Sequence, residues 1–142
     1  MSEAPPASGA VQVPVALTTF LAIDFGLKRT GVAVGNRLMR SAQAVGTVCA
    51  QGDARFPHIE KHLREWQPDA IVIGVPYHPD GVAHENTARA KKFGRQLHGR
   101  FALPVFEVDE RYSTTEALAS GAKDADAASA CIILEQFLRS LP

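Results

Sequence analysis

The sequence has no surplus of charge. Its 142 residues include 15 Lys and Arg and 15 Asp and Glu, which gives a formal net charge of zero at pH 7. This balance excludes a general attraction to nucleic acid or anionic membranes, so a polyanion would have to bind a local basic cluster. No run of about 18 apolar residues is present, and we expect no membrane span. The two cysteines, Cys49 and Cys131, lie in apolar surroundings, which favours buried free thiols over a disulfide.

A length of 142 residues and an apolar share of 46% are typical of one globular domain. The N-terminal stretch is rich in Pro, Ala and Ser, and it lacks the basic segment of a secretory signal peptide. We therefore expect residues 1–18 to form a mobile tail and residues 19–142 to form a single domain. We also expect the protein to be cytoplasmic.

Short apolar runs bounded by turn residues predict five strands, and a 3.6-residue periodicity predicts the helices. The expected strands are residues 19–24, 30–35, 41–50, 70–76 and 103–109. The expected helices are residues 56–66, 87–100 and 126–138, and the "STTE" at 113–116 matches a capping box that would begin a further short helix.

The predicted fold class is α/β, with a mixed five-stranded sheet and helices on both faces. The first three strands are close in sequence and favour an antiparallel meander, whereas the later strand–helix units favour parallel pairing. If the strands lie in the order third-second-first-fourth-fifth, the parallel strands bring their C-terminal ends to one edge. Open α/β sheets bind their ligands at that edge.

Three carboxylates stand at the ends of predicted elements. Asp24 ends the first strand, Glu110 follows the fifth strand, and Asp126 opens the last helix. Each has a simpler interpretation, as a turn residue, a solvated loop residue and a helix N-cap, respectively. Asp109 and Asp124 are close neighbours that could be the functional acids instead. In the strand order given above, however, Asp24 and Glu110 lie near each other, and the helix that begins at Asp126 can place its first turn over the same edge.

Carboxylates gathered within a few ångström repel one another and require cations. Their hard oxygen atoms suit Mg²⁺ or Mn²⁺. Two such ions, about 3.5–4 Å apart, can activate water and stabilise the leaving oxygen of a phosphodiester. The acidic residues therefore favour a metal-dependent nuclease with two divalent ions.

Four blocks of the sequence resemble the signature blocks of the YqgF (RuvX) family: "AIDFGLKRTGVAVG", "IVIGVPYHPDG", "DERYSTTEA" and "DAASACIILEQFL". The resemblance covers about residues 20–138 and implies a ribonuclease H-like fold. The family is implicated in maturing the 5′ end of 16S ribosomal RNA and is described as similar to Holliday-junction resolvases. The resemblance implies that Asp24, Glu110 and Asp126 are the acidic triad, and it favours Asp126 over Asp124. Between the last two blocks the chain has only "LASGAKDA", where many relatives have a longer loop.

Basic side chains near the acidic residues are candidates for binding phosphate. Lys28, Arg29 and Arg111 lie beside the expected triad, and the family places Arg111 in its "DER" block. On the predicted helix 87–100, Lys92 and Arg95 belong to a basic arc that is either a phosphate-backbone track or an ordinary solvated face. The expected partner is structured RNA, such as precursor ribosomal RNA, or branched DNA.

The loop after the fourth strand leaves an alternative open, and the histidines and cysteines bear on zinc binding. Tyr77 and His78 follow the fourth strand and could stack on a base, or could merely pack against the protein. The histidines and cysteines show no zinc spacing.

Three further functions are open alternatives. A Holliday-junction-type DNA resolvase would use the same acids. An RNA-binding assembly adaptor would have the fold without the catalysis. A strand that ends in Asp-x-Gly before a hairpin also occurs in the phosphate loop of actin-like and sugar kinases, but those enzymes close two domains over ATP and are much longer. The sequence does not indicate an oligomeric state.

Overall fold

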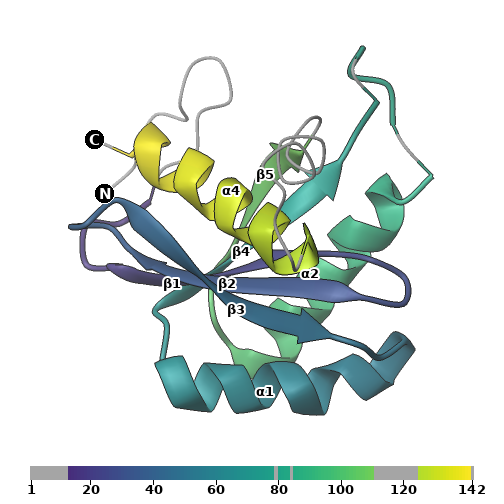
Figure 1. Ribbon diagram of the computed structural model, residues 1–142, viewed down its shortest axis with the longest axis horizontal. Coiled ribbons are helices and arrows are strands. Elements are labelled where there is room, and N and C mark those ends of the chain that lie inside the picture. The colour runs from purple at the N-terminus through teal and green to yellow at the C-terminus, as the bar shows by residue number, and fades with distance from the viewer. Residues whose placement is uncertain (1–12, 79, 84, 111–124, 142) are drawn as a thin grey trace, which may run out of the picture.

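The computed structural model describes residues 13–78, 80–83, 85–110 and 125–141, and its centre is a five-stranded sheet with the order β3-β2-β1-β4-β5 (Figure 1). The strands are β1 (Thr19–Asp24), β2 (Thr30–Asn36), β3 (Ser41–Val48), β4 (Ala70–Pro76) and β5 (Val105–Glu110). The helices are α1 (Arg55–Trp66), α2 (Thr87–Phe101) and α4 (Ala125–Ser140), and a 3-10 turn, Gly52–Ala54, precedes α1. The fold class and the strand order are confirmed. The helix expected at residues 113–116 lies outside the described residues.

The sheet is mixed because its two halves are connected differently. β1, β2 and β3 follow one another through short loops and pair antiparallel. β1 pairs parallel with β4, and β4 pairs parallel with β5. Parallel neighbours require a crossover, and α1 and α2 supply the two crossovers. As a result, β1, β4 and β5 end at the same edge of the sheet.

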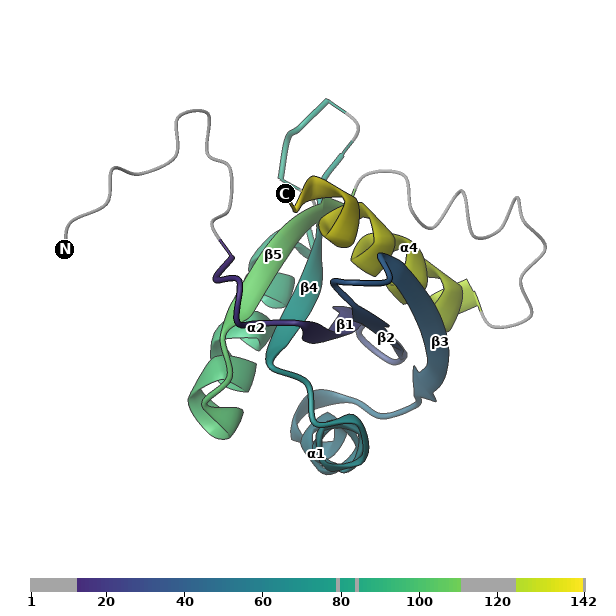
Figure 2. The ribbon, with the colours of Figure 1, turned by 90° about the vertical axis from the view of Figure 1, so that its left-hand side faces the viewer.

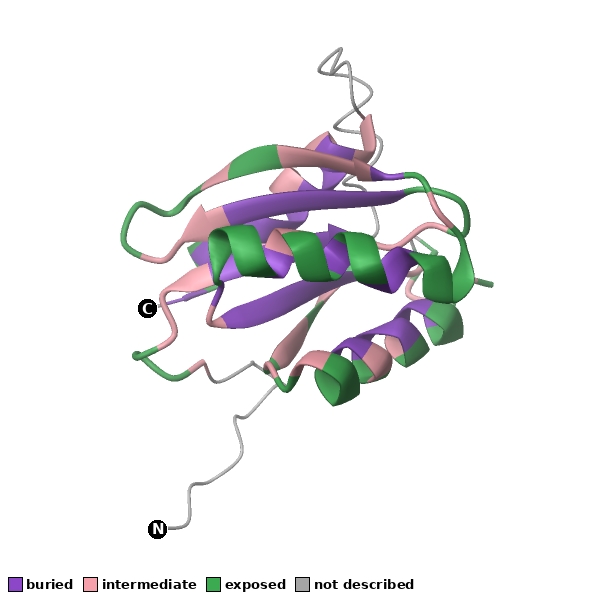
Figure 3. Cartoon of the chain, turned by 90° about the horizontal axis from the view of Figure 1, so that it is seen from below, coloured by how far each residue is buried: buried purple, intermediate pink, exposed green. Residues whose placement is uncertain are grey.

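The helices cover both faces of the sheet. Figures 1 and 2 show α4 on one face and α1 and α2 on the other. The alternation of side chains along β1 matches these layers: Phe20 and Ala22 pack with the α4 side, whereas Leu21 and Ile23 pack with the α1 and α2 side. All four residues are fully buried. The central strands are therefore continuously apolar, and Figure 3 shows them buried behind α1 and α2, whose outer faces are exposed.

The chain that enters β1 is held by Asp69, directly before β4. One carboxylate oxygen of Asp69, Oδ2, accepts hydrogen bonds from the backbone N–H of Thr18 at 2.9 Å, from the backbone N–H of Thr19 at 3.0 Å and from the Thr18 hydroxyl at 3.1 Å. The backbone bonds are the main reason that the pKa of Asp69 lies below its usual value. This junction fixes where β1 begins, and so where it ends.

Residues before β1 already contact the domain. Val13 and Leu17 pack against the α4 side of the core, and the guanidinium of Arg37 donates to the carbonyl of Pro14 at 2.8 Å. The boundary at residue 18 stays a prediction. In the described part of the chain, no helix has the length and apolar character that crossing a bilayer requires.

The two cysteines are both free, as expected, but their burial differs from the expectation. Cys131 is partly buried on α4, and burial together with nearby Glu135 raises the pKa of its thiol. Cys49 is exposed, so the prediction of a buried thiol there was wrong. It follows the last residue of β3, at the margin of the sheet, where its apolar neighbours in sequence do not cover it.

Candidate active site at the C-terminal edge of the sheet

Asp24 is the last residue of β1 and lies where three parallel strands end. Its Cα pairs with Gly31 on β2 and with Gly74 on β4, and Gly74 in turn pairs with Val108 on β5. Asp24 comes two residues after Ala22, so strand alternation places it on the face covered by α4. The residue is partly buried. A strand end on the α4 face is therefore where the first carboxylate of the predicted site lies.

Gly31 brings the first turn of α4 onto this strand end. A Cβ atom built on Gly31 would lie 1.8 Å from the backbone oxygen of Asp126 and 2.9 Å from the backbone nitrogen of Ala127. Only a residue without a side chain permits this approach. Since Gly31 is the strand partner of Asp24, the structure brings Asp24 and Asp126 to the same residue from two different elements.

Asp126 lies in the first turn of α4, which begins at Ala125. The simpler interpretation of Asp126 as only an N-cap does not fit this position, because its backbone already has helical geometry and a cap residue has to precede the helix. The position still suits an acid, because the first turn of a helix carries unpaired N–H groups and a partial positive charge.

Arg29 neutralises Asp126 in the structure. Its Nε lies 2.8 Å from Oδ2 of Asp126, and the two side chains are 61% and 31% exposed. An ion pair as accessible as this contributes little to stability, typically about 0–1 kcal/mol. We therefore consider its main consequence to be positional: it holds a guanidinium, which can bind phosphate in a bidentate manner, beside the acidic residues.

Glu110 is the last residue of β5, where it pairs with Pro76, and its side chain is not described. Asp24 on β1 pairs with Gly74 on β4, and Gly74 pairs with Val108 on β5. Glu110 lies two residues beyond Val108, toward the end of the strand. The backbone thus brings position 110 to the expected edge. Arg111 and Asp124 lie outside the described residues. Within the described ranges, no group of three potential metal-ligating side chains is formed, and the complete triad stays a prediction.

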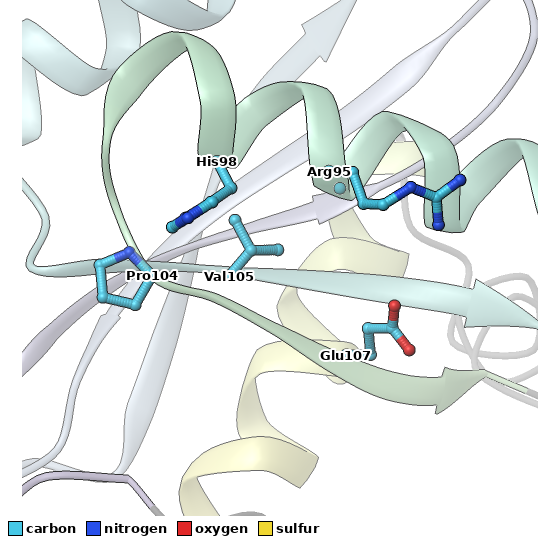
Figure 4. A pocket seen from close by; sticks show the side chains of 6 residues that line it. Arg95, His98, Pro104, Val105 and Glu107 are labelled. Atoms are coloured by element: carbon cyan, nitrogen blue, oxygen red, sulfur yellow. The ribbon is translucent and has the colours of Figure 1, made fainter.

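The other predicted binding residues fall into two separate places. Lys28 and Lys92 line one cavity of about 430 Å³ beside the β1–β2 loop, on the α1 and α2 face. Arg95 lines a different cavity, between α2 and β5, together with His98 and Glu107 (Figure 4). Lys92 and Arg95 of α2 therefore line two separate hollows, and their role in binding phosphate stays a prediction.

Tyr77 packs rather than projecting as a stacking platform. It contacts the core on the α1 and α2 side and forms an isolated bridge with Ala83. Its hydroxyl hydrogen-bonds Lys91, and this bond, followed by the charge of Glu107, raises the pKa of Lys91. The Nζ of Lys91 lies 3.7 Å from Oε1 of Glu107. His78 is exposed.

Sequence reasoning missed two residues of this region, Gly31 and Arg55. Gly31 sits within an apolar run and looked like an ordinary strand residue, because its contact with Asp126 spans most of the chain. Arg55, the first residue of α1, is only 5% exposed and donates to the backbone oxygen of Leu27 at 2.7 Å. Burial lowers the pKa of its guanidinium. Its place in the sequence, outside any apolar stripe, gave no sign of burial.

Comparison with known structures supports the fold. The structure of Thermus thermophilus RuvC in complex with a Holliday junction substrate aligns with a TM-score of 0.54, at 16% sequence identity, over 87% of this chain and 94% of that one. A second structure of Thermus thermophilus RuvC aligns with a TM-score of 0.50 at 13% identity, over 86% of this chain and 95% of that one. At these identities the likeness shows a shared fold.

Sequence comparison identifies the family. A protein of Albidiferax ferrireducens is 68% identical over 141 residues, covering 99% of this chain and 90% of its own length. A protein of Polaromonas sp. is 72% identical over 126 residues, covering 89% and 91%. Both carry the name "Putative pre-16S rRNA nuclease". The model of the family described as "RuvX: Holliday junction resolvase" matches residues 18–140, and the chain belongs to the RuvX family.

Proposed function

We propose that this chain is a divalent-metal-dependent nuclease of the cytoplasm that hydrolyses phosphodiester bonds at the C-terminal edge of its sheet. The observation that carries the proposal is the contact of Gly31 with both Asp24 and Asp126, which brings the backbone of an acidic strand residue and that of an acidic helix residue to the same point. The backbone position of Glu110 on the parallel strand β5 adds a third acid to the same edge.

The donor set fits Mg²⁺ or Mn²⁺, since both ions prefer carboxylate oxygens. Asp24, Glu110 and Asp126 would hold two such ions, which would supply an activated water and stabilise the leaving oxygen. The contact of Arg29 is compatible with this, because it uses Oδ2 of Asp126 and a carboxylate has a second oxygen. Arg29 then lies within reach of a bound phosphate.

We propose the 5′ end of precursor 16S ribosomal RNA as the substrate. The names of the relatives at 68% and 72% identity support this choice. A branched-DNA resolvase is the second candidate, favoured by the description of the family and by the fold shared with RuvC. Both activities would use the same acidic residues, so the substrate and not the site distinguishes them.

The test is to incubate purified protein with a precursor 16S RNA transcript and with a four-way DNA junction, in Mg²⁺, Mn²⁺ or EDTA. We expect cleavage of the RNA in either ion and none in EDTA. Asp24→Asn should abolish cleavage and, in the absence of metal, unfold at no lower temperature than the parent, because removing one of several clustered negative charges relieves repulsion. A fully active Asp24→Asn enzyme would show that Asp24 is only a turn residue.

A second pair of variants distinguishes Asp126 from Asp124. Asp126→Ser should keep the fold, because the side chain lies in the first turn of α4 and its accessible ion pair with Arg29 contributes little to stability. It should lose most of the metal-dependent rate, because a hydroxyl does not replace the carboxylate as a metal ligand. Asp124→Ser is the matched control and should change cleavage little. An active Asp126→Ser enzyme would contradict the proposed triad.

A further inference from the structure

We propose that the cavity between the β1–β2 loop, the start of α1 and the first half of α2 binds a backbone phosphate of the nucleic-acid strand beside the bond that is cut. The inference rests on the proposed nuclease function and adds a second, non-cleaving phosphate site to it. The cavity has a volume of about 430 Å³. Its charged lining residues within the described part of the chain are Lys28, Asp53, Arg55, Arg89 and Lys92.

Charge is the first argument. The lining holds four cationic side chains and one carboxylate, in a protein whose net charge is zero. Lys28, Arg89 and Lys92 are exposed, and none of the three forms an ion pair with a described residue. Concentrating unneutralised positive charge in one hollow of a neutral protein favours an anionic occupant over a neutral one.

Arg55 is the second argument. Its side chain is 95% buried, yet no described carboxylate pairs with it, and its Nε is buried without a hydrogen-bond partner. The guanidinium carbon lies 4.7 Å from the ring centre of Phe25 and 5.2 Å from that of Phe93. These two rings also line the cavity, and both lie within cation–π distance of the guanidinium. A buried cation that lacks a counter-charge is costly unless an anion supplies one.

The position of the cavity is the third argument. The loop that leaves Asp24 divides its basic residues between the two faces of the sheet: Arg29 pairs with Asp126 on the α4 side, and Lys28 lines the cavity on the α1 and α2 side. The bond from Arg55 to the carbonyl of Leu27 ties this loop to α1. A strand whose scissile phosphate lies beside Asp24 therefore has a basic hollow next to it, and phosphate contacts of this kind fix the register of a nucleic acid.

The first experiment observes Arg55 directly. In ¹⁵N-labelled protein without metal, the Nε–Hε resonance of Arg55 should shift on titration with pyrophosphate and with a short single-stranded RNA. The resonance of Arg64, exposed on the outer face of α1, is the internal control and should stay in place. An unmoved Arg55 resonance at saturating RNA would overturn the proposal.

The second experiment uses two double variants that remove the same charge. The first double variant, Arg89→Gln with Lys92→Gln, removes two cationic side chains from the lining of the cavity. The second, Lys61→Gln with Arg64→Gln, removes two exposed cationic side chains from α1. RNA binding is measured by fluorescence anisotropy in EDTA over a range of KCl concentrations. The first variant should lower the log–log salt slope by roughly 1.4, at about 0.7 per lost single-strand contact. The second should bind as the parent does; equal losses in both would contradict a localised site.

Asp53→Asn tests the sign of the argument, because it removes the carboxylate of the lining and should tighten RNA binding about two- to fivefold. Weaker or unchanged binding would contradict the proposal. All these readouts are taken without metal, so they separate the two proposals. If the parent cleaves RNA but its cavity binds no phosphate, only the proposal of a phosphate site is refuted. If the cavity binds RNA but the protein does not cleave it, only the proposed nuclease function is refuted.

Discussion

Replacing Gly31 with Ala tests whether the contact between β2 and α4 assembles the proposed active site. The added Cβ would lie 1.8 Å from the carbonyl oxygen of Asp126, 2.3 Å from its carbonyl carbon and 2.9 Å from the nitrogen of Ala127. Real Cβ contacts are essentially never shorter than 3.0 Å, so the first turn of α4 must move away by more than about 1 Å. All the clashing atoms are backbone, and rotation of a side chain therefore cannot relieve the contact.

Two effects of different size follow from this displacement. Forcing a methyl group into a packed contact costs about 1–3 kcal/mol, which for a domain of this size lowers the melting temperature by roughly 3–12 °C. A shift of about 1 Å in a catalytic group costs about 100-fold in rate. We therefore expect Gly31→Ala to remain folded at 25 °C and to lose about 100-fold in Mn²⁺-dependent cleavage.

The measurements are the melting temperature by circular dichroism and the single-turnover cleavage rate. Gly99→Ala is the matched control, because Gly99 lies in α2 and a Cβ there meets no atom within 4 Å. Ala in a helix interior is favoured over Gly by up to about 1 kcal/mol, so this control should be as stable as the parent or more stable, and fully active. A Gly31→Ala protein with parental stability and rate would refute the argument that this contact positions Asp126.

Three other predictions concern stability, binding and reactivity. Asp69→Ala should destabilise the fold by about 1–3 kcal/mol in urea titrations at pH 7, because three donors lose a charged acceptor. The pKa of Asp69 is depressed by folding, so this stabilisation is present above pH 4 and should disappear as the pH falls through the folded-state pKa, below 3.8; a difference between parent and variant that persists at pH 2 would contradict this. Charge reversal at Lys92 and at Arg95 should weaken RNA binding and lower the salt slope by roughly 0.7–0.9 per lost contact, and an unchanged slope would show that the α2 face is merely solvated. Iodoacetamide should modify exposed Cys49 well before Cys131, whose thiol has a raised pKa, and mass spectrometry after timed quenching would show the opposite order if this is wrong.

The fold was largely predictable because its signals are local. Apolar runs and 3.6-residue periodicity placed the five strands and three of the helices within a few residues of their ends, and short loops against long crossovers fixed which strands pair antiparallel. The placement of Asp24 and Glu110 at the same edge of the sheet then followed from the strand order. Each of these inferences uses residues that are close in sequence, or a general rule of sheet topology.

The features that the sequence did not reveal depend on contacts between distant segments. Gly31 and Asp126 are far apart in the chain, and nothing in "TGVAVG" indicates that one glycine faces a helix. Arg55 becomes buried only when Phe25 and Phe93 close over it from two other elements. Similarly, the role of Asp126 depended on where α4 begins, and helix boundaries vary by a residue or two even in known structures.

The two acidic residues that adjoin Gly31, Asp24 and Asp126, belong to parts of the molecule with different resistance to local opening. Asp24 continues the central strand, flanked by β2 and β4 and preceded by four fully buried residues, so its backbone opens only with the whole domain. Asp126 lies in the first turn of a helix, where backbone N–H groups lack intrahelical partners and opening is easy. An ion held by both would therefore leave the strand unchanged and slow amide exchange mainly in the first turn of α4. In the proposed site, β1 would therefore supply the rigid ligand and the first turn of α4 the adjustable one.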